Sequence, residues 1–116
     1  MRVLQNFING AFVPAETNEH LEAPNPATEE VIASSPVSTD ADVDRAYAAA
    51  AAAFAGEWGA TTPQDRSNAL WRIAEEMERR AADFADAESL DCGKPRETII
   101  ADEIMQSVDQ IRFFAG

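Results

Sequence analysis

The sequence of 116 residues has few of the residue types that build reactive or cross-linked sites. It contains one cysteine, one histidine and five glycines. A single cysteine cannot form an internal disulfide, which is typical of a protein kept in a reducing compartment. The glycines form neither GxGxxG nor a Walker pattern, so no phosphate-binding loop is predicted. His20, the lone histidine, lies among polar residues and indicates no metal cluster.

Positive charge and long apolar runs are also scarce. Nine Lys and Arg stand against 21 Asp and Glu, so the net charge is −12 at pH 7. Binding to nucleic acid or to an anionic membrane surface needs clustered cations, which this composition does not supply. The alanine-rich uncharged run that starts at Ala46 and ends before Glu57 is too short to span a bilayer. The N-terminus lacks the apolar core of a signal peptide. We therefore expect a soluble cytoplasmic protein.

The first 37 residues are typical of short strands joined by turns. Asn9-Gly10, flanked by apolar residues, predicts a tight type I′ hairpin over residues 6–13. Residues 21–23 and 31–37 are further extended segments, and the prolines of 24–28 predict a turn between them. Pro36 indicates either an edge strand or the exit from a strand. This part of the chain predicts a small set of antiparallel strands.

From Ser38 onward the pattern becomes helical. Thr39 and Thr62 are favourable N-caps, each followed by acidic residues in the first turn. The spacing predicts helices from about residue 40 to 55, from 63 to 91 and from 95 to 115. Their apolar faces are Val43, Ala46, Tyr47, Ala50, Ala53 and Phe54; Leu70, Ile73, Met77, Ala81 and Phe84; and Ile100, Ile104, Val108 and Ile111, continued by Phe114 or Ala115.

The bend Asp91-Cys92-Gly93-Lys94-Pro95 joins the second and third predicted helices. Gly93 can adopt the left-handed conformation that closes a helix, and Pro95 suits the first turn of the next. A catalytic role for Cys92 is the obvious hypothesis, but a helix C-terminus and an adjacent acid both disfavour a thiolate. We therefore interpret Cys92 as structural and predict no catalytic residue in this chain.

Two places near the bend are candidates for binding. Asp91, with the carbonyl oxygens freed at a helix end, would suit a hard cation; the alternative is an ordinary helix-terminal acid that pairs with Lys94. Glu103 and Gln106 would present one polar edge to a groove; the alternative is a solvated helix face. The residues alone leave both choices open.

Five landmarks follow one another along the chain: Phe7-Ile8-Asn9-Gly10, Asn25-Pro26-Ala27-Thr28, Trp58, Asp91-Cys92-Gly93-Lys94-Pro95 and Phe113-Phe114-Ala115-Gly116. In this order they resemble the N-terminal segment of the aldehyde dehydrogenase superfamily. The bend from Cys92 to Pro95, together with Asp102-Glu103-Ile104, Val108-Asp109 and residues 112–116, is most similar to the bacterial 4-aminobutyraldehyde dehydrogenase branch, close to betaine aldehyde dehydrogenases.

The resemblance implies an α/β fold, with short antiparallel strands followed by three helices that flank a Rossmann-like sheet in the full enzyme. Residues 1–116 would be the N-terminal part of the NAD(P)-binding domain, with a strand region at 1–37 and a helical region at 38–116. The catalytic and oligomerisation regions would be absent, so the segment alone would be inactive and would hold no cofactor-binding residue. The parent would be an NAD-dependent homotetramer or homodimer that oxidises an ω-aminoaldehyde through a thiohemiacetal on a cysteine outside this chain.

The resemblance also implies binding roles for two sets of residues in this sequence. Related enzymes bind a monovalent cation through main-chain oxygens before the Asn-Pro turn and through the aspartate of the bend, which correspond here to Ala23, Pro24 and Asp91. In aminoaldehyde enzymes, acids on the helix after the bend lie near the mouth of the substrate channel. These positions correspond to Glu103 and Gln106, with Asp102 and Asp109 as further candidates, and Gln106 replaces a second acid.

The C-terminal end bears on the choice between two classes of function. The chain stops at Phe113-Phe114-Ala115-Gly116 without a polar tail, and aromatic side chains at a helix end lack a partner there. We therefore expect a truncated enzyme. The alternative is a non-catalytic acidic helical module that binds partners through its uncovered apolar faces.

Overall fold

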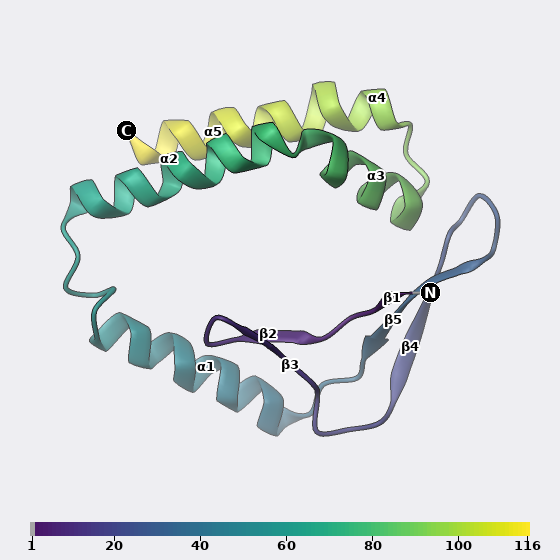
Figure 1. The fold of residues 1–116 in the computed structure, drawn as a ribbon, viewed down its shortest axis with the longest axis horizontal. Coiled ribbons are helices and arrows are strands. Elements are labelled where there is room, and N and C mark those ends of the chain that lie inside the picture. The colour runs from purple at the N-terminus through teal and green to yellow at the C-terminus, as the bar shows by residue number, and fades with distance from the viewer. Residues whose placement is uncertain (1) are drawn as a thin grey trace. The chain divides into compact units, whose positions relative to one another are not determined.

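The computed structural model describes residues 2–116, which fold into short strands followed by helices (Figure 1). The strands are β1 (Arg2–Val3), β2 (Asn6–Ile8), β3 (Ala11–Val13), β4 (His20–Pro24) and β5 (Val31–Pro36). The helices are α1 (Asp40–Ala55), α2 (Pro63–Arg79), α3 (Ala81–Cys92), α4 (Arg96–Thr98), the π-helical η1 (Ile99–Ile104) and α5 (Met105–Ala115). They form two compact units, residues 2–24 with 28–60 and residues 25–27 with 61–116, which are described separately.

The hairpin of the first unit forms where the sequence predicts it. β2 pairs antiparallel with β3 and places Phe7 opposite Phe12, with ring centroids 5.0 Å apart. Asn9 and Gly10 have φ angles of 52° and 78°, the positive values that a type I′ turn requires at both central residues. The turn chemistry of two residues therefore sets the register of this hairpin.

The remaining strands form a three-stranded sheet in the order β1-β5-β4. β5 lies in the middle, so Pro36 ends a central strand, and the edge-strand alternative for Pro36 is wrong. β4 pairs with β5 antiparallel, as expected, but β1 pairs with it in parallel. β1 is two residues long. It is too short to show any alternation of apolar and polar residues, so the sequence did not predict this parallel pair.

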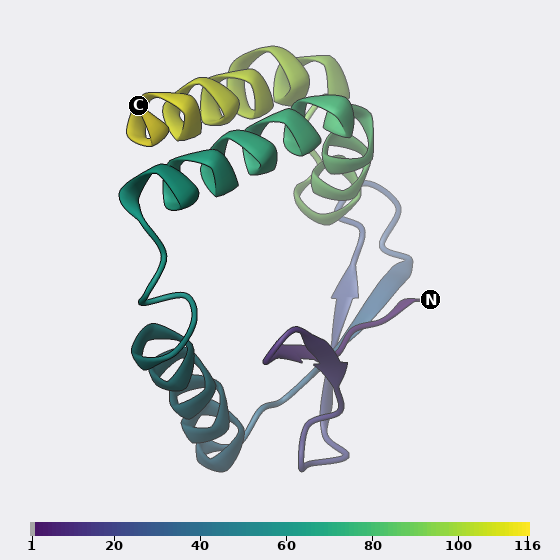
Figure 2. The same ribbon diagram turned by 60° about the vertical axis from the view of Figure 1, so that its left-hand side comes forward.

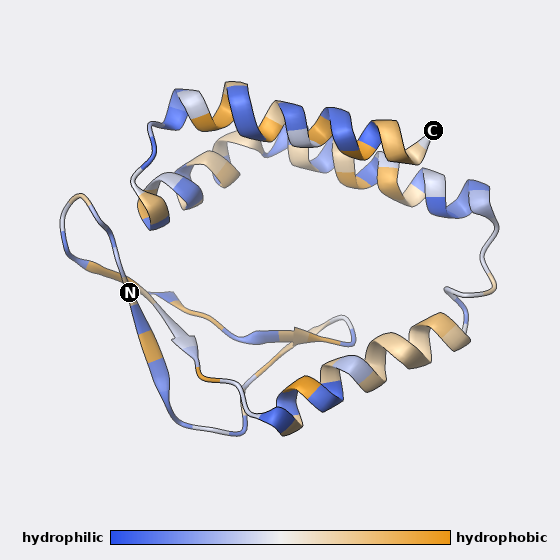
Figure 3. Ribbon diagram, turned by 180° about the vertical axis from the view of Figure 1, so that it is seen from behind, coloured by the Kyte–Doolittle hydropathy of each residue, from blue (hydrophilic) through white to orange (hydrophobic). Residues whose placement is uncertain are grey.

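Helix α1 begins and ends as predicted. Thr39 is the N-cap of a capping box that it forms with Asp42, and Gly56 follows the last turn. Its predicted apolar face, however, is not buried: the side chains of Val43, Tyr47 and Phe54 are all exposed. After its first turns the helix is coloured mostly as apolar in Figure 3, which reflects its run of alanines.

The second unit is helical and contains an apolar core. α5 lies along α2 (Figures 1 and 2). Where α3 meets η1, Ala85, Ile99 and Ile104 form a buried cluster, and Met77 and Ala81 pack against it. The other buried apolar residues of this unit are Ala74, Val108 and Ala115.

The single helix predicted over residues 63–91 is wrong, because it breaks at Arg80. This residue has φ −104° and ψ 20°, and it separates α2 from α3. Neither glycine nor proline marks the break. α3 instead turns away from the direction of α2 (Figure 2) and buries Ala85 against η1. Two residues predicted to be core, Ile73 in α2 and Phe84 in α3, are 54% and 42% exposed.

The third predicted helix forms, but its first turns differ from a regular α-helix. It begins at Arg96, immediately after Pro95, and its residues 99–104 are π-helical. The Met105 N–H donates to the Ile100 carbonyl, a bond across five residues where an α-helix spans four. Ile99 is therefore fully buried, whereas Ile100, which the α-helical spacing predicts as core, is only partly buried.

Candidate functional site

The bend between α3 and α4 closes as the sequence predicts. Gly93 has φ 76° and ψ 10°, and its N–H donates to the Ser89 carbonyl at 2.9 Å. The Ser89 hydroxyl donates to the Lys94 carbonyl at 2.7 Å. A Cβ on residue 93 would lie 3.0 Å from Cγ of Pro26. Glycine is therefore required by both the left-handed conformation and the proximity of Pro26.

Lys94 links the two elements on either side of the bend. Its Nζ lies 2.9 and 3.1 Å from the two carboxylate oxygens of Glu103 in η1 and 3.5 Å from Oε1 of Glu88 in α3. The hydrogen bond to Glu103 is the largest cause that raises the pKa of Lys94 above its ordinary value. Lys94 thus pairs with these two acids, and the predicted alternative pairing with Asp91 is wrong. Arg96 adds a second link through an ion pair with Asp86 of α3.

Cys92 lies in the last turn of α3 and is exposed. Its Sγ donates to the Glu88 carbonyl at 3.0 Å, a bond within the helix. His20, which a Cys–His dyad would need, belongs to the first unit, where its Nδ1 lies 3.0 Å from the Asn18 carbonyl. The geometry around Cys92 is that of a helix-terminal residue.

The two predicted channel residues lie on the helical segment after the bend. Glu103 is in η1 and partly buried, and Gln106 is in α5 and exposed. The Glu103 carboxylate is already engaged by Lys94, so a cationic ligand would have to share it or compete for it. The channel role of both residues stays a prediction.

The three predicted cation ligands belong to different units. Ala23 and Pro24 end β4, where the pairing with β5 becomes irregular. Asp91 is exposed in the last turn of α3, in the second unit. The cation set therefore stays a prediction. Within residues 2–116, no group of three or more His, Cys, Asp or Glu side chains is placed to hold a metal ion.

Asp42, which sequence reasoning noted only as a favourable first-turn charge, is the most constrained acid in the first unit. Its side chain is almost fully buried, at 2% residue exposure. It accepts hydrogen bonds from the Thr39 N–H at 2.8 Å and the Glu16 N–H at 3.3 Å, and it pairs with Arg45. The bond from the Thr39 backbone is the largest cause that lowers the pKa of Asp42. The T-x-x-D spacing signalled the cap, but the contact with Glu16, 26 residues away in sequence, had no local signal.

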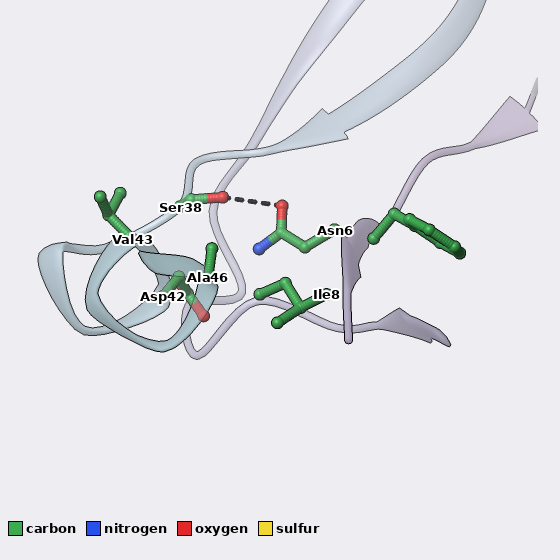
Figure 4. Close-up of a pocket in the computed structure, with 7 residues that line it drawn as sticks. Asn6, Ile8, Ser38, Asp42, Val43 and Ala46 are labelled. Atoms are coloured by element: carbon green, nitrogen blue, oxygen red, sulfur yellow. Dashed lines mark hydrogen bonds between the residues drawn. The ribbon is translucent and has the colours of Figure 1, made fainter. Parts of the chain in front are cut away.

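A small pocket lies beside Asp42 in the first unit (Figure 4). It is lined by residues of the β2–β3 hairpin and of the start of α1, including Ile8, Val43 and Ala46. At its edge the Ser38 hydroxyl donates to Oδ1 of Asn6 at 3.0 Å. The polar side chains that line it, Asn6, Ser38 and Asp42, all have hydrogen-bond partners, so the pocket offers shape without a reactive group.

None of the helices formed by residues 2–116 has both the length and the apolarity needed to cross a membrane.

Comparison with known proteins decides the family. Residues 12–116 match the model of the aldehyde dehydrogenase family. The chain belongs to this family. Acetaldehyde dehydrogenase 2 of Cupriavidus necator is 43% identical over 97% of this chain, and the mitochondrial 10-formyltetrahydrofolate dehydrogenase of Mus musculus is 41% identical over 97%. The NAD+ complex of the aldehyde dehydrogenase of Bacillus cereus superposes with a TM-score of 0.95 at 35% identity and covers 99% of this chain.

The aldehyde dehydrogenase match confirms the α/β fold class, because 99% of the chain superposes on a solved member of the family. The chain spans only part of these relatives: 22% of the Cupriavidus protein, 12% of the mouse protein and 24% of the Bacillus cereus chain. The assignment of residues 1–116 to the NAD(P)-binding domain stays a prediction.

Proposed function

We propose that this chain is the N-terminal segment of a longer NAD(+)-dependent aldehyde dehydrogenase. The proposal is supported chiefly by the superposition of almost the whole chain on an aldehyde dehydrogenase solved with NAD+. In the parent enzyme the aldehyde would be oxidised to the acid through a thiohemiacetal on a cysteine outside this chain, with NAD+ as the hydride acceptor. Cys92 takes no part in this chemistry.

Within this proposal the segment contributes scaffold and surface. The Gly93 bend and the Lys94 link fix where the α4–α5 helical run begins. That run in turn carries Glu103 and Gln106. We further propose a cytoplasmic homotetramer or homodimer as the parent, with a monovalent cation at Ala23, Pro24 and Asp91. The alternative, a non-catalytic acidic interaction module, is not favoured, because the family match extends over residues 12–116.

A narrower proposal concerns the substrate, an ω-aminoaldehyde such as 4-aminobutyraldehyde. It is supported by the resemblance of residues 92–95 and 102–116 to the aminobutyraldehyde branch. The Glu103 carboxylate would attract a protonated amine, although Lys94 screens it. The relatives named above carry the names of other aldehydes, acetaldehyde among them.

One assay tests both levels of the proposal. The complete protein that contains this segment is given NAD+ and either 4-aminobutyraldehyde or butyraldehyde, and NADH formation is followed by absorbance. We expect turnover with both and a lower KM for the aminoaldehyde. Absence of turnover with any aldehyde would refute the family activity, and equal KM values would refute the aminoaldehyde alone. The 116-residue chain by itself is the control and should form no NADH.

A further inference from the structure

An apolar groove lies along α2 in the second unit. It has a volume of about 460 Å³ and is lined by residues of α2 and α3: Ala69, Arg72, Ile73, Glu76, Met77 and Phe84. Ala69, Ile73 and Met77 are four residues apart, so they form one row on the helix surface. Ile73 and Phe84 are both exposed. Exposed apolar side chains that are gathered in one place commonly mark an interaction surface.

The groove is built on the packed helices of this unit. Met77, which lines it, also packs against the buried cluster of Ala85, Ile99 and Ile104. Phe84 directly precedes Ala85 on α3, so both sides of the groove are anchored in the same core. The groove is therefore a preformed surface, as binding sites usually are.

Arg72 is the charged group of this groove that is free to bind a partner. Its guanidinium has no hydrogen-bond or ion-pair partner within residues 2–116. Glu76, the other charged residue of the groove, accepts a hydrogen bond from Nε of Arg79 at 2.8 Å. Other arginines of this unit each pair with a carboxylate: Arg79, Arg80, Arg96 and Arg112. An unpaired arginine in a chain of net charge −12 favours an acidic group on whatever covers the groove.

We propose that the groove is the docking site for a later segment of the same polypeptide, which places an apolar side chain between Ile73 and Phe84 and a carboxylate against Arg72. The inference rests on the proposed function, in which the parent enzyme is much longer than this chain. The chain spans 24% of the Bacillus cereus aldehyde dehydrogenase on which it superposes, so most of the parent polypeptide lies outside it.

A segment of the same polypeptide suits this groove better than a separate molecule. Covalent linkage gives it a high effective concentration at the groove, which a free partner lacks. A second copy of this chain would bring another net charge of −12, and the two copies would repel each other. The groove itself is mostly apolar and needs only one carboxylate, opposite Arg72.

The first experiment measures access to the groove in the complete protein. Ile73→Cys and Glu75→Cys are labelled with N-ethylmaleimide, and peptide mass spectrometry follows each new thiol separately from the native cysteines. Glu75 is the matched control, because it is exposed on the same helix but lies outside the groove. Urea-unfolded protein gives the intrinsic rate of each thiol. Relative to that rate, we expect labelling at position 73 to be at least about tenfold slower than at position 75, because access limits the reaction.

The second experiment identifies what covers the groove. The photoreactive amino acid benzoylphenylalanine replaces Ile73 in the complete protein, and illumination links it to the segment that lies against it. We expect the linked peptide to come from beyond residue 116 of the same chain, with the mass of one chain on a denaturing gel. Arg72→Glu should lower the yield at least about threefold, because it replaces attraction of a carboxylate by repulsion. Arg72→Lys keeps the charge and should retain most of the yield.

Three results would overturn the inference. Labelling rates within about twofold of each other at positions 73 and 75 would show that the groove is open to solvent. A cross-linked product with the mass of two chains would assign the groove to a second copy. A yield that Arg72→Glu leaves unchanged would exclude the carboxylate. If the complete protein oxidises no aldehyde, the proposed function fails, and the labelling and cross-linking still decide what covers the groove.

Discussion

The two units of this chain bury different kinds of residue. In the first unit the buried side chains within residues 2–24 and 28–60 are Ser34 and Asp42, both polar. In the second unit the buried residues are all apolar: Ala74, Ala85, Ile99, Ile104, Val108 and Ala115. The second unit therefore has an apolar core within its own helices. The first is organised by strand pairing, a tight turn and the hydrogen bonds of one carboxylate.

This difference indicates where each unit is sensitive to change. Apolar burial is roughly proportional to area and is lost when a core side chain is shortened. A polar arrangement such as that of Asp42 depends on the geometry and protonation of a few groups. The largest apolar side chains of the first unit, such as Phe12, Tyr47 and Phe54, are exposed and add little to its stability. Truncating substitutions should therefore act mainly on the second unit. Acid should act on the first unit through Asp42 and on the second through Asp65 and Glu76, whose pKa values are also lowered by hydrogen bonds.

The largest expected effect is that of Ile99→Ala in the second unit. Ile99 is fully buried, and shortening such a side chain costs about 3 kcal/mol, partly through the cavity that remains. Urea unfolding of the 116-residue chain measures this cost. Ile73→Ala is the matched control, because Ile73 is a helical isoleucine that is 54% exposed, and it should cost less than about 1 kcal/mol. Equal costs would mean that the face of α2 is covered in solution.

An intermediate effect is expected when the two positive-φ glycines are replaced by alanine. Gly10 and Gly93 have nearly the same φ, 78° and 76°. A Cβ on Gly10 would meet nothing within 4 Å, whereas one on Gly93 would lie 3.0 Å from Pro26. Gly10→Ala should therefore cost about 1 kcal/mol from backbone strain alone. Gly93→Ala should cost about 2 kcal/mol, because the contact adds to the strain. Urea unfolding that ranks Gly10→Ala above Gly93→Ala would contradict this.

The smallest effect is a pH dependence centred on Asp42. Its folded-state pKa is lowered, chiefly by the Thr39 backbone hydrogen bond. The carboxylate therefore contributes stability that is fully present above the unfolded pKa of about 3.9 and is lost as the pH falls through the lower folded value. The fall in the free energy of unfolding between about pH 5 and pH 2, here called the acid limb, should be smaller in Asp42→Asn than in the wild type when measured by urea unfolding. Asp44→Asn, an exposed neighbour on α1, should leave the limb in place. An unchanged limb in Asp42→Asn would refute the assignment.

The candidate site was predicted in part. The closure of the helix at Gly93 follows from the conformational freedom of one residue, so its position could be named in advance. The acid that pairs with Lys94 could not be named in advance. Asp91 is three residues away along the chain, whereas Glu103 is nine residues away and reaches Lys94 only because α3 and η1 pack together. Sequence proximity favoured the wrong acid.

The sequence by itself determined those features that depend on interactions within about four neighbouring residues. They are the Asn9-Gly10 turn, the caps at Thr39 and Thr62, and the bend at Gly93. Each depends on the φ preference of one residue or on a hydrogen bond between near neighbours.

Tertiary structure alone decided the break at Arg80, the burial of Ile99 in place of Ile100, and the central position of β5. In each case the residues that meet are far apart in sequence, and no local preference distinguishes the outcome. A regular α-helix through Arg80 satisfies every local rule. In the broken form, Ala85 is buried against Ile99 and Ile104. Burial of apolar surface depends on how the helices of the unit pack together, so the local sequence does not specify it.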